Sequence, residues 1–206
     1  GGDALYYDWE DAAGWHSETA DATSAPTSIS IVLDEAGHAH VAYVDTLTWH
    51  VKYASRDPAG WSIATIAQDT FDDPYYVQAV LCLDASGRPH VGYAAGSHQT
   101  AMLKHLTKEA SGWHPTTLGS GTFNRLRGIA LGVADDGQPH LACTPDDSAE
   151  VLHAWRDPSG WQSAQYRPSA YGYDFQLKFD TLGRLHVVFV DEDGIGWEGI
   201  SYAMGT

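Results

Sequence analysis

The sequence predicts an all-β fold, a small β-propeller with most simply four blades of four antiparallel strands each. Two repeated phrases carry this prediction, and both recur about every 50 residues. The first phrase is a polar turn followed by a histidine and an apolar run, centred on His40, His90, His140 and His186. The second is an acidic residue three positions before Gly-Trp, ending at Trp15, Trp61, Trp113 and Trp161. Two landmarks with one period indicate a repeat architecture.

Within one repeat, short runs rich in β-branched and aromatic residues alternate with turn residues. The four expected strands of the first complete unit are Thr27–Leu33, His40–Val44, His50–Ala54 and Trp61–Ile66. Asp34–Gly37 and Arg56–Gly60 supply the Gly- and Pro-containing turns between them. No segment shows a sustained helical period. Four antiparallel strands in about 50 residues correspond to one propeller blade.

The repeat places residues 1–206 in a single propeller domain. Its units are expected at about 24–68, 74–120, 124–168 and 170–206, the last of which is completed by residues 3–20. Joining the two ends in one blade would remove the exposed sheet edges of an open array. However, Leu5–Tyr7 and Ile200–Ala203 both match the third strand of a unit. Either one of them is surplus, or the chain is cut from a longer array.

Composition excludes some classes of partner. The 27 acidic and 11 basic residues give a net charge of -16, so we expect neither nucleic acid nor an anionic membrane as a partner. The apolar runs Ile29–Leu33 and Val187–Val190 are too short to cross a bilayer. Residues 1–3 have no signal-peptide character, which leaves localisation open, with secretion plausible. Cys82 and Cys143 lie in apolar strand patterns and are expected to be buried free thiols rather than a disulfide.

One repeat reads Leu81-x-x-Asp84-x-x-Gly87-x-Pro89-His90-Val-x-Tyr93, and an acidic-x-x-Gly-Trp phrase follows it. This combination resembles the repeats of sialidase-like (BNR-type) bacterial β-propellers over nearly the whole chain. The resemblance implies the fold, but that superfamily includes glycosidases, lectins and adhesion modules. The Asp-box Ser-x-Asp-x-Gly-x-x-Trp is absent, and the arginine cluster and Tyr/Glu pair of a sialidase are not recognisable. Sialidase activity is therefore not implied.

The repeated side chains are expected to be structural. The four histidines open the second strand of each blade, about 4.8 Å from the first strand that lines the axis, so they are poorly placed for a metal on that axis. We expect each to connect its own turn to a backbone group of the next blade. The tryptophans, together with Tyr43, Tyr93 and Phe189, are expected to pack between blades.

The residues that differ between repeats gather in the loops between second and third strands and between blades, which share one face of a propeller. The candidate ligand-binding residues on this loop face are Trp49, His50, Tyr75, Tyr76, His98, Asn124, Arg127, Tyr171, Tyr173, Asp174, Asp193 and Trp197. Aromatic surfaces flanked by carboxylates and amides suit a sugar ring, which needs an apolar face to stack on and partners for its hydroxyls.

The sequence therefore favours a non-catalytic binding module, lectin-like or protein-recognising, with no cofactor. No nucleophile motif occurs. A metal-dependent enzyme using His50 and His98, or a glycosidase using two loop carboxylates, remains an alternative. Asp146-Asp147 and Asp191–Gly194 offer oxygen ligands for Ca²⁺ but do not match a calcium loop. A third alternative is a structural blade array cut from a larger protein, which could dimerise through an unpaired strand edge.

Overall fold

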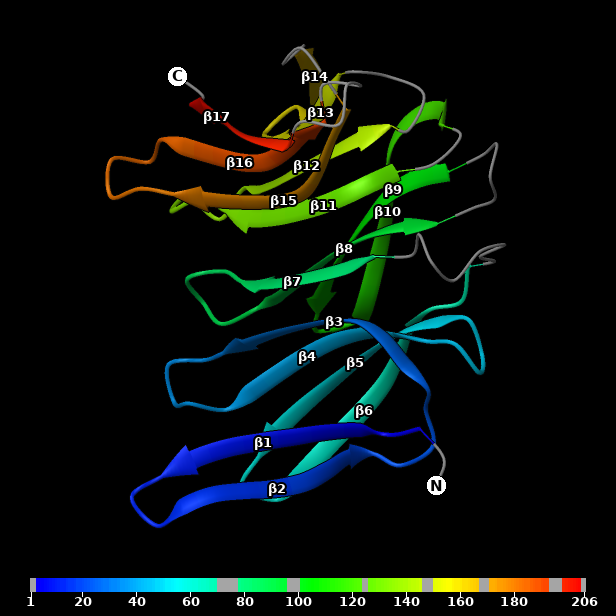
Figure 1. Ribbon diagram of the computed structural model, residues 1–206, viewed down its shortest axis with the longest axis vertical. Coiled ribbons are helices and arrows are strands. Elements are labelled where there is room, and N and C mark those ends of the chain that lie inside the picture. Colours follow the sequence, from blue (N-terminus) through cyan, green and yellow to red (C-terminus); the bar gives the residue numbers. More distant parts are fainter. Residues whose placement is uncertain are drawn as a thin grey trace.

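The structure is a computed structural model. It describes residues 3–69, 78–95, 101–123, 126–145, 150–166, 171–192 and 198–204. Within these residues, seventeen strands form five separate antiparallel sheets that follow one another along the longest axis of the molecule (Figure 1). Among the described residues there is no helix long and apolar enough to cross a membrane.

Three of the sheets contain four strands in sequence order, as the repeat predicts. The first sheet consists of β3 (Pro26–Leu33), β4 (Ala39–Asp45), β5 (His50–Asp57) and β6 (Gly60–Ala67). The second consists of β7 (Ala79–Leu83), β8 (Pro89–Ala95), β9 (Ala101–Glu109) and β10 (Gly112–Phe123). The third consists of β11 (Leu126–Val133), β12 (Pro139–Pro145), β13 (Val151–Asp157) and β14 (Gly160–Tyr166).

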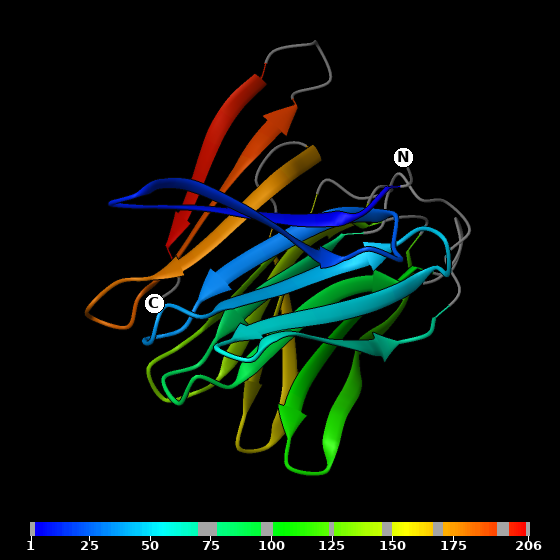
Figure 2. The same cartoon turned by 90° about the horizontal axis from the view of Figure 1, so that it is seen from below.

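The two remaining sheets lie at opposite ends of the molecule (Figure 1) and overlap when it is viewed from below (Figure 2). An N-terminal hairpin pairs β1 (Leu5–Asp11) with β2 (Gly14–Asp21), and a C-terminal sheet orders β15 (Tyr171–Phe179), β16 (Leu185–Glu192) and β17 (Glu198–Met204). The predicted closure of a four-bladed ring is not made, because within the described residues the hairpin and the C-terminal sheet do not pair. Both β1 and β17 occupy the third-strand position of the repeat, so they duplicate rather than complement each other.

The turns between first and second strands are built alike in the first, second and C-terminal sheets. In the first sheet, the Asp34 carboxylate accepts hydrogen bonds from the backbone N–H groups of Ala36 and His38, and Gly37 adopts a positive φ of 81°. Asp84 and Asp180 make the corresponding bonds in the second and C-terminal sheets. This is the local chemistry of an Asx turn, in which aspartate and glycine favour the tight reversal. The face that carries these turns is called the turn face below.

Neighbouring sheets meet at four seams, numbered from the N-terminus, and each seam buries its own apolar cluster. Alternate residues of the second strand face opposite seams. Tyr43 lies in the first seam, for example, and Val44 lies in the second. The core is therefore a series of layers between sheets, each closed by the next repeat.

The first strands contact one another through side chains rather than through backbone pairing. Ser28 and Ser30 of β3 accept hydrogen bonds from the backbone N–H groups of Ala79 and Leu81 in β7. Gln78 accepts the equivalent bond from the Ile129 N–H of β11. At the next seam, a Cβ on Gly128 would lie 2.9 Å from the backbone nitrogen of Asp174, so only glycine fits there.

The cysteines behave as predicted. Both are free thiols, with Cys143 fully buried and Cys82 half-buried. Burial raises the pKa of each thiol to about 12, which keeps both protonated and unreactive at neutral pH.

Candidate functional site

The structure describes part of the predicted loop face. Trp49, His50 and Asp174 lie on it with their side chains described, and the first two are neighbours at the loop that joins β4 to β5. For Arg127, Tyr171 and Tyr173 only the backbone is described. The remaining candidates lie outside the described residues: Tyr75, Tyr76, His98, Asn124, Asp193 and Trp197. Whether the twelve residues form one site therefore stays a prediction.

The described loop from Asp45 to His50 is organised by a buried carboxylate. Asp45 is fully buried and accepts hydrogen bonds from the backbone N–H of Leu47 and the hydroxyl of Thr48. Its backbone carbonyl accepts a 2.7 Å bond from the Trp49 N–H, and Trp49 has a positive φ of 57°. The indole packs on the apolar cluster of the second seam and stays half-buried. The loop thus presents an aromatic side chain on a fixed backbone.

A charged network lies behind this loop in the first seam. Lys52 places its ammonium 2.8 Å from an Asp45 oxygen and 3.2 Å from an Asp21 oxygen, and the Tyr43 hydroxyl donates a 2.7 Å bond to Asp21. Burial opposes ionisation of Asp21, but the hydrogen bonds outweigh it and lower its pKa. Burial together with Asp21 raises the pKa of Tyr43. Each charge is paired, so this network is structural.

The second seam repeats part of this network. Asp69 accepts hydrogen bonds from Tyr93 and Lys104, the residues that correspond to Tyr43 and Lys52. In the third seam the same two positions hold Cys143 and Leu152, and the seam is apolar there. Tyr43 and Tyr93 therefore do pack between sheets as predicted.

His40 and His90 connect their own turn to the third strand of their own sheet. Nε2 of His90 lies 3.4 Å from Asp84, and its Nδ1 lies 3.0 Å from Nε2 of His105 on β9. Since Asp84 can only accept, His90 carries its proton on Nε2, and its Nδ1 accepts from His105. His40 with Tyr53, and His140 with His153, make the equivalent contact. The predicted contact with the turn is confirmed for His40, His90 and His186. The second partner of His40, His90 and His140 is a side chain of the same sheet and not a backbone group of the next.

The paired histidines are neutral at physiological pH. Burial, with smaller contributions from His90 and Arg156, lowers the pKa of His105 to about 3. Burial and His140 lower the pKa of His153 to about 4. Among the described residues no group of three or more histidine, cysteine, aspartate or glutamate side chains is arranged to hold a metal ion.

The tryptophans pack between sheets, as predicted, wherever a preceding sheet is present. Trp61, Trp113 and Trp161 each meet a third-strand aromatic ring of the preceding sheet edge-on, at Tyr7, Tyr53 and His105. Trp15 belongs to the N-terminal hairpin and is 73% exposed. Trp61, Trp113 and Trp161 are therefore seam residues.

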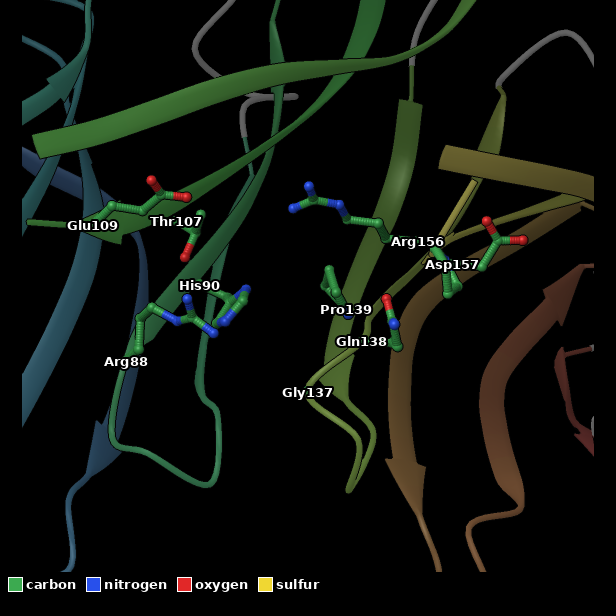
Figure 3. Close-up of a pocket in the computed structure, with 10 residues that line it drawn as sticks. Arg88, His90, Thr107, Glu109, Gly137, Gln138, Pro139, Arg156 and Asp157 are labelled. Carbon is green, nitrogen blue, oxygen red and sulfur yellow. The ribbon is translucent and has the colours of Figure 1, made fainter. Parts of the chain in front are cut away.

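A cavity that the sequence reasoning missed lies in the third seam, at the turn face. It has a volume of about 280 Å³, and Arg88, His90, Thr107 and Glu109 line one wall from the second sheet (Figure 3). Gln138 and Arg156 line the opposite wall from the third sheet. The signal that could have revealed it is the loss of a large side chain at one position of the third strand, which holds Trp9 in β1 but Thr107 in β9.

Comparisons with known proteins support the fold. No protein-family model matches the sequence, and no curated protein matches it. The structure is similar to the Aleuria aurantia lectin solved with alpha-methyl-L-fucoside, with a TM-score of 0.57 and 11% identity over 98% of this chain and 61% of the lectin. It is also similar to the intramolecular trans-sialidase from Ruminococcus gnavus, with a TM-score of 0.58 and 10% identity over 94% of this chain and 48% of that one. For the leech intramolecular trans-sialidase the TM-score is 0.56, with 9% identity over 95% of this chain and 35% of that one.

These similarities identify the fold. This chain folds as a run of propeller blades. It spans between about a third and three-fifths of the lengths of those three proteins. The BNR-type resemblance in particular stays a prediction, because sequence identities near 10% support the similarity of fold and nothing more specific.

Proposed function

We propose that this protein is a non-catalytic, lectin-like propeller that binds a glycan on its loop face. The observation that carries the proposal is the loop from Asp45 to His50, where a buried carboxylate holds a half-buried indole in place at the variable face. A preorganised aromatic ring with polar neighbours suits the apolar face and hydroxyls of a sugar. The Aleuria aurantia lectin, of similar fold, is solved with a fucoside, and this similarity supports the ligand class.

The described carboxyl groups favour binding over hydrolysis. A glycosidase needs one carboxylic acid with a raised pKa as a general acid. Every described carboxyl group with a shifted pKa is shifted downward, and most are tied into turns or seams, as with Asp34, Asp45 and Asp84. The described carboxylates thus serve as hydrogen-bond acceptors of the fold. These pKa directions support the non-catalytic form of the proposal.

The test is a titration of the full chain with a broad glycan panel, read by the indole N–H signals in nuclear magnetic resonance spectra. We expect at least one glycan to shift the Trp49 signal, and Trp49→Ala to weaken binding at least tenfold. Trp15→Ala is the matched control, since Trp15 is an exposed indole away from the loop face. No binding at millimolar glycan, or equal affinities for Trp49→Ala and the wild type, would refute the proposal. Turnover of a glycoside would refute its non-catalytic part.

A further inference from the structure

The cavity of the third seam differs from the corresponding place in the first seam at two positions. In the first seam, the guanidinium of Arg56 lies 4.9 Å from the ring centre of Trp9 and is hydrogen-bonded to Glu18. The strand registers align these positions through the seams. Trp9 corresponds to Thr107, Glu18 to Thr116, and Arg56 to Arg156. The third seam therefore keeps the arginine but replaces both of its partners with threonine.

Two polar groups in the cavity are consequently left without partners. Arg156 forms no ion pair with any residue that the structure describes, in contrast to Arg56. The hydroxyl of Thr107 is buried, with the residue only 7% exposed, and has no hydrogen-bond partner within the described part of the chain. A buried hydroxyl without a partner costs about 1–3 kcal/mol, so native proteins rarely leave one unsatisfied without a reason. Both residues line the same cavity (Figure 3).

The remaining charges around the cavity balance one another. Arg88 is neutralised by Asp84 at 2.8 Å, and the neighbouring His90 is buried, which lowers its pKa and keeps it uncharged. Glu109 and Asp157 offset Arg156, and Asp157 is held by hydrogen bonds from Ser159. The net charge of -16 of the whole chain repels anions as well. A neutral ligand with both donors and acceptors fits this lining better than an anion.

From this geometry we infer that the third-seam cavity is a second binding site, which takes one neutral monosaccharide unit. In this site Arg156 donates to ring hydroxyls and Glu109 accepts from another, and Thr107 leaves open the space that Trp9 fills in the first seam. The volume of about 280 Å³ lies just below the range of about 300–1,000 Å³ that is typical of drug-sized ligands, which suits a single sugar ring. The inference shares the ligand class of the proposed function but uses different residues on the opposite, turn face.

The experiment titrates the full chain with neutral methyl hexopyranosides of the gluco, galacto, manno and fuco series, and with methyl glucuronide as the anionic counterpart. The indole N–H of Trp161 reports on the cavity, because its ring packs on His105 beside it. We expect a neutral glycoside to shift the Trp161 signal with millimolar affinity, and the glucuronide to bind more weakly. Glu109→Gln should reduce the difference in affinity between the neutral glycoside and the glucuronide, because it removes a negative charge from the cavity.

Two variants and one control make the result specific. Arg156→Gln should weaken binding at Trp161 at least tenfold, and Thr107→Trp should block it by refilling the space that Trp9 occupies in the first seam. Arg56→Gln removes the equivalent charge outside the cavity and should leave binding unchanged. The inference is overturned if no neutral glycoside shifts Trp161, if only the glucuronide does, or if Arg156→Gln binds normally. Binding at Trp49 without Trp161 refutes this site alone, whereas the reverse refutes the loop-face proposal alone.

Discussion

The first and third seams are built from the same repeated positions, yet the side chains fill them in different ways. In the first seam, Tyr43 and Lys52 meet Asp21 inside the seam, and Glu18 neutralises Arg56 at its turn-face end. In the third seam, Cys143 and Leu152 make the interior apolar, and at the turn-face end Arg156 faces a cavity. Because the backbone repeats, the difference between the seams is carried by a few side-chain changes.

This contrast separates two ways of holding sheets together. A buried charge network is stable only while every member keeps its partner, because an uncompensated buried charge is costly. An apolar seam loses only the contacts and the volume of the atoms that are removed. Variants at matched positions in the two seams can therefore measure the two mechanisms within one chain.

The largest expected effect is from Asp21→Ala in the first seam. It leaves the Tyr43 hydroxyl without its acceptor and Lys52 with Asp45 alone, and we expect a loss of about 3 kcal/mol in the free energy of unfolding. Cys143→Ala is the counterpart in the third seam and should cost about 1 kcal/mol, because one buried sulfur is removed. Urea denaturation of both variants measures the difference. Equal losses would show that the charge network does not dominate the first seam.

An effect of intermediate size is expected from pH on the free energy of unfolding, and it distinguishes the histidine–histidine pairs from the histidine–tyrosine pair. In the folded state the pKa of His105 is lowered to about 3 and that of His153 to about 4. Between these values and about pH 6.5, the unfolded chain therefore binds more protons than the folded chain. Their contribution is fully present above about pH 6.5 and is lost as the pH falls toward those folded values. Each proton taken up on unfolding contributes a slope of up to about 1.4 kcal/mol per pH unit.

Exchanging the partners tests this dependence. His105→Tyr gives the second sheet the His–Tyr pair of the first sheet and should make unfolding free energy less dependent on pH between 7 and 5. Tyr53→His makes the reverse exchange beside His40 and should steepen that dependence. Urea denaturation at several pH values provides the slopes. Parallel curves for the wild type and His105→Tyr would contradict the assignment of the proton uptake to this pair.

The sequence predicts what the repeat determines locally, and the seams show where such prediction ends. The strands expected at Thr27–Leu33 and Trp61–Ile66 match β3 and β6 to within one residue at each end, because turn residues limit them on both sides. The tryptophan packing is also repeated and was predictable. The partner of His90 was missed because His105 lies on another strand, and its choice depends on register. The cavity was missed because it depends on non-repeated residues that two different sheets bring together.

The smallest effect is expected from variants that move the carboxylate partner of the arginine from the turn-face end of the first seam to that of the third. Glu18→Gln removes the carboxylate that pairs with Arg56, and Thr116→Glu places one opposite Arg156 in the third seam. Both sites are partly or fully exposed, so solvent limits the gain or loss to about 0.5 kcal/mol, with opposite signs for the two variants. Thermal melts at low and high salt should show the Thr116→Glu gain shrinking as salt screens the new pair. A gain that persists at high salt would mean that the glutamate stabilises the seam by packing, and the free charge of Arg156 would not be what distinguishes this seam from the first.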